Sequence, residues 1–110
     1  MLNQIVLVGR LVKMTEVITT ESGKSMAYLT LAIPRTFKNA DGEYDTDFID
    51  CVLRDTVAET TSEYCKQGDL IGIKGRVQSR MVEDKDGNNY KKIEIVTEKV
   101  TFLSSKKEEE

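Results

Sequence analysis

Alternating apolar and polar positions dominate this chain. In the segment 46–55 (TDFIDCVLRD), every second residue from Ile49 to Leu53 is apolar, which is the period-two pattern of a strand with one buried face. Phe48 and Arg54 therefore fall on the outward face of this strand. Four other segments predict strands through alternation or β-branched composition: 4–12, 26–35, 69–82 and 91–103.

The pattern changes once, after Asp55, where apolar residues take a helical spacing. We expect one short helix over residues 56–66, begun by a capping box in which Thr56 and Glu59 exchange side-chain-to-amide hydrogen bonds. Gly68 is the expected stop signal. The predicted order is therefore strand, strand, strand, helix, strand, strand.

Turn residues separate these elements. Residues 19–25 are rich in turn formers, and the Asp86-Gly87 pair predicts a tight hairpin between the last two strands. Residues 37–47 are expected to form a polar loop before the third strand.

Three glycines, Gly9, Gly72 and Gly75, fall inside predicted strands, where glycine commonly marks a sharp bend or a bulge. Five such strands, with a helix between the third and the fourth, match the OB-fold, a five-stranded Greek-key β-barrel. The predicted fold class is therefore all-β with one short helix. We expect residues 1–103 to form this domain and residues 104–110 to be a charged, disordered tail.

The composition suits one compact domain: 110 residues, 39% hydrophobic and 32% charged. No apolar stretch approaches the roughly 20 residues of a membrane helix, and the first residues lack the features of a signal peptide. We therefore expect a cytoplasmic protein. Cys51 and Cys65 lack a metal-ligand spacing and are expected to be free thiols in a reducing compartment.

The inventory of reactive side chains argues against catalysis. The chain contains no histidine, the commonest general base and metal ligand, and no CxxC, Walker or GxGxxG motif. The segment 41–47 (DGEYDTD) has alternating acids but lacks the spacing of a calcium loop. We therefore expect no enzyme activity, no cofactor and no metal.

The net charge of −3 hides an uneven distribution. Glu108, Glu109 and Glu110 end the chain, and four more acids lie in residues 41–47. Without its last three residues the chain is neutral, so individual surfaces can be basic although the whole is not.

Two predicted strands carry outward residues suited to nucleic acid. The third strand presents Phe48 and Arg54, and the fourth presents a basic row that contains no acid: Lys74, Arg76 and Arg80. Single-strand binders combine a positive groove with aromatic rings on which bases stack, and arginine can both stack and pair with phosphate. The pattern therefore favours binding of a single-stranded nucleic acid.

The chain resembles the bacterial single-stranded DNA-binding protein family. The similarity runs from residue 1 to about residue 103, in the family's order and spacing, through MLNQIVLVGRL, LTLAIPRTF, DFIDCVL, AET..EYC.QGD, GRVQSR and EDKDGN. The resemblance implies an OB-fold that binds single-stranded DNA, without catalysis, in replication, recombination and repair. It also implies a homotetramer, with dimers paired through their first strands, at the bacterial nucleoid.

The resemblance implies individual binding residues as well. Phe37 and Phe48 match aromatic residues on which bases stack. The cations that match residues along the DNA path are Arg35, Lys74, Arg76 and Arg80.

The chain departs from the family pattern at three places. Arg54 and Val82 stand where the family usually has aromatic residues, so two stacking platforms are missing. At roughly 1–3 kcal/mol per stacked base, that loss predicts weaker binding, which Arg54 offsets in part by contacting phosphate. The family's long tail with an acidic, Pro- and Phe-containing tip is absent, so recruitment of repair enzymes through such a tip is not expected.

Two alternative functions stay open at this point. An OB-fold that has lost aromatic residues could be a protein-interaction module of the replication or primosome machinery, with Phe48 as a contact residue. An OB domain that prefers RNA is the other alternative. The first strand is apolar on both faces, which fits either a central barrel strand or a subunit contact; its residues are Ile5, Val6, Leu7 and Val8.

Overall fold

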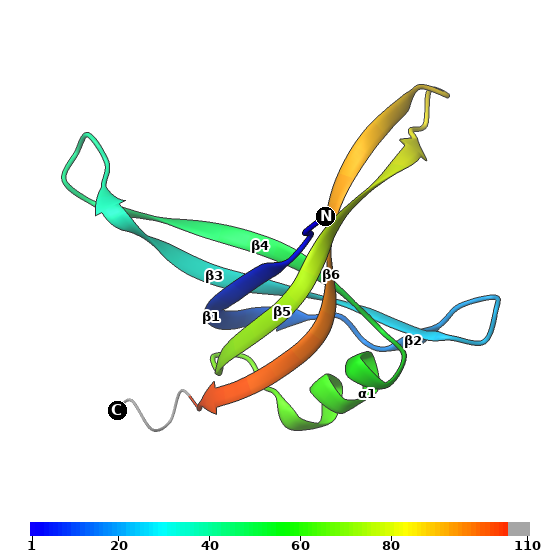
Figure 1. Ribbon diagram of the computed structural model, residues 1–110, viewed down its shortest axis with the longest axis horizontal. Coiled ribbons are helices and arrows are strands. Elements are labelled where there is room, and N and C mark those ends of the chain that lie inside the picture. The colour runs from blue at the N-terminus through cyan, green and yellow to red at the C-terminus, as the bar shows by residue number, and fades with distance from the viewer. Residues whose placement is uncertain (106–110) are drawn as a thin grey trace.

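Strands form most of the computed structural model, which describes residues 1–105 (Figure 1). The elements in chain order are β1 (Ile5–Met14), β2 (Ile18–Thr19), β3 (Ser25–Lys38), β4 (Tyr44–Arg54), α1 (Asp55–Tyr64), β5 (Leu70–Glu83) and β6 (Asn89–Ser104). The five predicted strands and the single helix are confirmed. The two-residue strand β2, which pairs with the start of β3, was not predicted.

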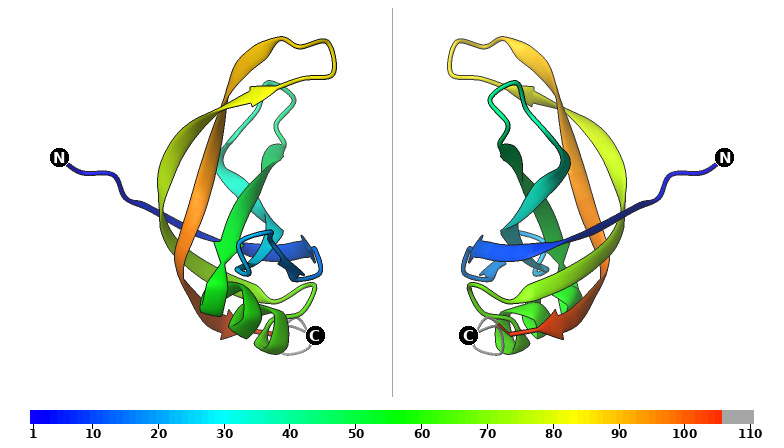
Figure 2. Two further views of the ribbon diagram at one scale, coloured as in Figure 1. Left: turned by 90° about the vertical axis from the view of Figure 1, so that its right-hand side faces the viewer. Right: turned by 90° about the vertical axis from the view of Figure 1, so that its left-hand side faces the viewer.

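Five strands close into a barrel in the order β1-β5-β6-β4-β3, and pairing of β3 with β1 completes the circle. Every pair is antiparallel except β4 and β6, which run parallel at Cys51–Ile95 and Val52–Val96. The helix α1 lies across one end of the barrel (Figure 2). This arrangement confirms the predicted OB-fold.

The core consists of the apolar side chains that alternation assigned to the inner face. Ala27, Leu29 and Leu31 of β3 are buried, as are Cys51 and Leu53 of β4. Strands β1 and β5 and the helix complete this cluster with Leu11, Ile71, Ile73 and Ala58.

Two strand glycines permit close approaches that close the barrel. A Cβ on Gly75 would collide with the carbonyl group of Val96, at the position where the β5–β6 register shifts. A Cβ on Gly9 would lie 2.7 Å from the carbonyl oxygen of Ala32, where β1 crosses to β3. The predicted bulge is therefore confirmed at Gly75, whereas at Gly9 the structure shows a close approach of two strands within a regular β1–β5 register.

The polar segment 37–47 is mostly strand, contrary to prediction. β3 continues to Lys38 and β4 begins at Tyr44, so only residues 39–43 connect them. The Asn39 side chain accepts hydrogen bonds from the amides of Asp41 and Glu43, at 2.9 and 3.0 Å. This local turn lets polar residues on both sides pair as strands.

The predicted capping box is also wrong. The helix begins one residue earlier, at Asp55, and Arg54 occupies its N-cap without a side-chain hydrogen bond. Glu59 instead accepts a hydrogen bond of 3.0 Å from the Ser25 hydroxyl on β3. A sharp turn at Asp55, with φ of 55°, joins β4 to α1.

Besides the short β2–β3 hairpin, two longer hairpin arms extend from the barrel and diverge from each other (Figure 1). We call them the β3–β4 arm (residues 33–49) and the β5–β6 arm (residues 78–94). They separate because β4 and β6 are paired at only two positions. The predicted Asp86-Gly87 turn closes the β5–β6 arm, with Gly87 at φ of 81°.

The expected boundary of the domain at residue 103 is close to the end of β6 at Ser104. Residues 106–110, and with them most of the predicted tail, lie outside the described residues. No helix in the described part of the chain is long and apolar enough to cross a membrane.

Candidate nucleic-acid interface

Alternate side chains of β4, β6 and β5 lie on one outer face, because the strand register aligns them. Val52 is paired with Val96, and Val96 is paired with Arg76. Since alternate residues of a strand share a face, the register carries this face along all three strands. Its members, here called the outer face, are Phe48, Asp50, Val52, Arg54, Arg76, Gln78, Arg80, Val82, Tyr90, Lys92, Glu94 and Val96.

A groove of about 300 Å³ opens where β4 and β6 separate. Val52 is buried along it, and the neighbouring Val96 is buried on the same face, so the outer face is hollowed at this point. The residues that line the groove are Tyr28, Phe48, Ile49, Asp50, Val52, Lys92, Ile93, Glu94 and Ile95.

The two predicted stacking aromatics lie on the β3–β4 arm. Phe48 is 65% exposed and lines the groove. Phe37 is equally exposed, but it lies farther out on the arm and does not line the groove. Exposed aromatic rings are costly in water, and the position of Phe48 beside a hollow makes it the stronger candidate for a base contact.

Arg80 forms the shortest ion pair of the outer face. Its Nε donates to Oε1 of Glu94 over 2.7 Å, and Glu94 is only 6% exposed. Desolvation alone would raise the pKa of Glu94, but the hydrogen bond and charge of Arg80, together with smaller contributions from Gln78 and Lys92, outweigh it and lower that pKa. The buried carboxylate therefore stays ionised and holds the guanidinium beside the groove.

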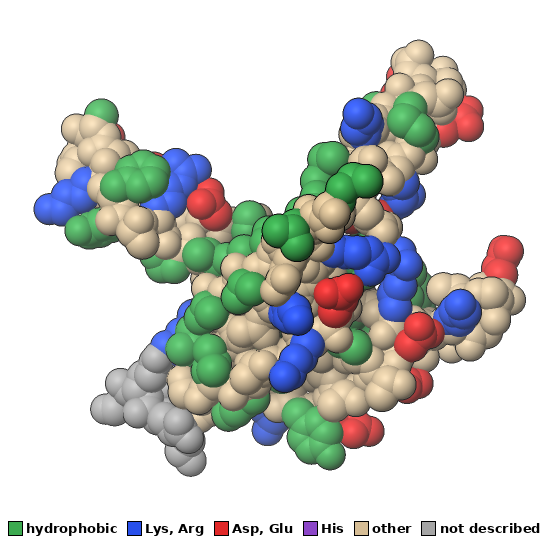
Figure 3. All heavy atoms as spheres, in the orientation of Figure 1, with side chains coloured by type: hydrophobic (Ala, Val, Ile, Leu, Met, Phe, Trp, Pro, Cys, Tyr) green, Lys and Arg blue, Asp and Glu red, His purple; other side chains and the backbone are tan. Residues whose placement is uncertain are grey.

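Arg76 is also paired, with its Nη1 3.7 Å from Oε2 of Glu98. The predicted row of β5 is free of acids within its own strand, but β6 supplies a carboxylate to each of these two arginines. Figure 3 shows Lys and Arg side chains next to acidic ones near the middle of the molecule. The predicted acid-free row therefore holds within β5 but does not extend across the outer face.

Arg35 lies on the opposite side of the β3–β4 arm from Phe48. Its guanidinium pairs with Asp47 at 2.9 Å and with Asp45 at 3.8 Å. Asp47 and Phe48 are neighbours in a regular strand, so their side chains point to opposite faces. The structure therefore does not bring Arg35 together with the groove.

The last two predicted cations, Lys74 and Arg54, lie outside the groove. Lys74 is exposed, is paired in register with Val6 of β1, and does not line the groove. Arg54 is exposed at the end of β4, beside Lys24 and Ser25 of the β2–β3 hairpin. It shares the outer face with Phe48, about 20 Å away at 3.3 Å per residue.

Of the residues that line the groove, only Phe48 was a predicted site residue, and the sequence analysis missed one further ring, Tyr28, and one cation, Lys92. Tyr28 alternates with the core residues Ala27 and Leu29, so its outward position was readable from the same pattern that assigned the core. Lys91 and Lys92 are adjacent, so the sequence does not show which lysine lies on the outer face. The pairing of Lys92 with Arg80 identifies Lys92.

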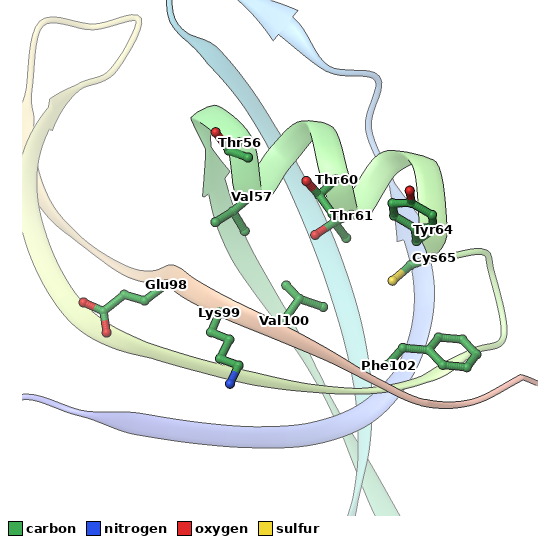
Figure 4. Close-up of a pocket in the computed structure, with 10 residues that line it drawn as sticks. All are labelled: Thr56, Val57, Thr60, Thr61, Tyr64, Cys65, Glu98, Lys99, Val100 and Phe102. Carbon is green, nitrogen blue, oxygen red and sulfur yellow. The ribbon is translucent and has the colours of Figure 1, made fainter.

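A second hollow, of about 270 Å³, lies between α1 and β6 at the end of the barrel (Figure 4). Tyr64 and Phe102 are exposed at one end of it, and Cys65 is half-buried between them. Both cysteines are free, and burial raises the pKa of Cys51 to about 11. In the part of the chain described, no group of three or more acidic, cysteine or histidine side chains could hold a metal ion.

Known proteins similar to this chain match it over nearly the whole length of the barrel. The sequence profile of the single-strand binding protein family matches residues 2–103. Single-stranded DNA-binding protein B of Bacillus subtilis (strain 168) is 41% identical over 109 residues, which cover 99% of this chain and 96% of that protein.

Two further relatives are longer than this chain. Single-stranded DNA-binding protein 1 of Staphylococcus aureus (strain COL) and single-stranded DNA-binding protein 3 of Listeria innocua are each 47% identical over 106 residues. These residues cover 96% of this chain but 64% and 66% of the two relatives, so the chain spans about two thirds of their length.

Proposed function

We propose, because the chain belongs to the single-strand binding protein family, that it binds and protects single-stranded DNA in replication, recombination and repair at the bacterial nucleoid. The observation that carries this proposal is the groove beside the exposed ring of Phe48, with Lys92 at its lining and Arg80 next to it. A ring next to a cation is the combination that single-strand binders use.

The charges of the groove favour one orientation of the strand. Asp50, held by a hydrogen bond of 2.6 Å from Thr30, and Glu94 place carboxylates at the groove lining. Phosphates are repelled by these groups and attracted by Lys92, which also lines the groove, and by Arg80 next to it. The bases therefore turn toward Phe48 and the groove, and the phosphates face the cations.

The function is tested by fluorescence anisotropy with labelled dT oligomers of increasing length. We expect saturable binding that is much tighter for dT oligomers than for a duplex of equal length, because stacking on Phe48 needs unpaired bases. Affinity should rise with length until the protomer's site is filled. Equal affinity for duplex and single strand would contradict the proposal.

Two copies of the chain are proposed to pair through β1, as a first step to a homotetramer. On β1, residues 5–9 are paired with β5 along one edge only, and an open strand edge is a template for a second chain. Val6 and Val8 are 65% and 49% exposed on this strand. The N-terminal segment also projects from the barrel (Figure 2).

Light scattering tests this pairing. We expect an oligomer for the unmodified chain and a smaller species for Val8→Lys, because a charge on the contact strand opposes its burial. The matched control is Ile18→Lys, which changes an equally apolar, exposed residue on β2 and should leave the mass unchanged. A monomeric unmodified chain would exclude the pairing.

The alternative function, a protein-interaction module of the replication machinery, is supported by the exposed Tyr64 and Phe102 at the hollow beside α1. Capture of a replication protein that survives nuclease treatment, together with weak dT binding, would favour it. Competition between dT and U oligomers decides whether the chain prefers DNA or RNA.

A further inference from the structure

We propose that Tyr90 is an additional base-stacking platform, which extends the path of the DNA from the groove onto the β5–β6 arm. This inference rests on the proposed function above. It is carried by strand register, exposure and the charges around the ring.

Register puts Tyr90 on the same face as the groove. It is paired directly with Val82 of β5, and Lys92, two residues further along, is paired with Arg80. The β5–β6 register is regular between Gly75 and Glu83, so alternation is not interrupted. Tyr90 therefore lies on the outer face that Phe48 shares, about 7 Å along the strand from Lys92.

The ring is available to a ligand. Tyr90 is 49% exposed, and no described residue forms a ring contact or ion pair with it. Val82 opposite is half-buried and aliphatic, so it has no flat surface for a base. Of this directly opposed pair, only Tyr90 can stack.

The surroundings of the ring suit a phosphate backbone. Lys92 follows Tyr90 on the same face, and Arg80 is the partner of Lys92 across the arm. Arg80 has a raised pKa, caused first by Glu94 and to a smaller extent by the proximity of Tyr28 and Tyr90. Lys92 and Arg80 therefore lie between two exposed rings of the outer face, Phe48 at the groove and Tyr90 on the arm, and a ring beside a cation is the combination that single-strand binders use.

This position also explains how the chain binds without an aromatic residue at Val82. In the resemblance described above, Val82 stands where a ring is usual, and its loss predicts a weaker site. Tyr90 returns a ring to the same pair of residues from the opposite strand. The stacking platform has therefore changed strand while keeping its place on the outer face.

The experiment compares dT affinities of Tyr90→Ala and Tyr90→Phe. We expect Tyr90→Ala to bind about 5- to 160-fold more weakly, as for loss of one stacked base. Tyr90→Phe should bind within about twofold of the unmodified chain because the ring remains. Tyr64→Ala, which removes an exposed ring beside α1, is the control and should bind like the unmodified chain.

A rescue separates stacking from a structural role. The double variant Val82→Trp with Tyr90→Ala should regain most of the lost affinity, because it returns a ring to the same face. The natural chain contains no tryptophan, so fluorescence of the introduced indole should be quenched when dT is added. If the unmodified chain binds dT but Tyr90→Ala binds equally well, this inference is overturned and the proposed function stands. If the unmodified chain does not bind dT, the proposed function itself fails.

Discussion

Replacing Phe48 with alanine is expected to weaken binding of a dT oligomer by about 5- to 160-fold per binding site. The ring is 65% exposed at the lining of the groove, and a stacked base contributes roughly 1–3 kcal/mol. Because half or more of the ring faces solvent, its removal leaves little cavity, and the melting temperature should change little. The loss should therefore appear in affinity and hardly at all in stability.

The matched control for this change is Phe102→Ala. Phe102 is also an exposed phenylalanine, but it lies at the end of the barrel beside α1 (Figure 4). Its removal should leave the affinity for dT within about twofold. Equal affinities for Phe48→Ala and the unmodified chain, measured by anisotropy at low salt, would exclude Phe48 as a stacking residue.

Raising the salt concentration tenfold is expected to weaken dT binding by roughly 600-fold. Four cations lie on the outer face: Arg54, Arg76, Arg80 and Lys92. If each neutralises one phosphate, the slope of log K against log salt is about −2.8, because each contact on a single strand contributes about −0.7. Binding that is equally tight at 50 and 500 mM salt would contradict an electrostatic site.

Arg54→Ala gives this prediction a residue-level test. No described carboxylate forms an ion pair with Arg54, so its charge is available to phosphate without exchange of a partner. We expect the slope to become shallower by about 0.7 in this variant. Lys13→Ala, which removes an exposed cation near the end of α1, is the control and should leave the slope unchanged.

The paired arginines should behave differently from Arg54. Arg76 and Arg80 already contact Glu98 and Glu94, so phosphate has to compete with a carboxylate for each guanidinium. The pairing keeps both guanidinium groups oriented in the free protein while lowering the net charge of the face. In a chain of net charge −3, these ion pairs keep Arg76 and Arg80 in place on the outer face, where phosphate can compete for them.

The strands, the core and the barrel were predictable because they follow from local rules. Period-two alternation assigned Leu29, Leu31 and Leu53 to the interior, since a strand with one buried face needs apolar residues at every second position. Gly75 marked a bulge because no other residue lacks a Cβ. The outward direction of Phe48 followed from the same alternation.

Rules based on neighbouring residues gave wrong predictions where contacts between distant segments determine the local structure. The capping box at Thr56 was a valid local signal, but Ser25 on a neighbouring strand takes the Glu59 side chain instead. The polar composition of segment 37–47 predicts a loop, because composition does not reveal that β3 and β4 pair on both sides of residues 39–43.

By itself, the sequence determined the fold and the outward position of Phe48. Only the tertiary structure decided which outward residues share a face. Parallel pairing at only two positions joins β4 to β6. The pairing of Val52 with Val96 puts Phe48 on the same face as Tyr90 through β6. Strand pairing over such sequence separations depends on the closed barrel and not on neighbouring residues, so it also decided that Arg35 faces away from the groove.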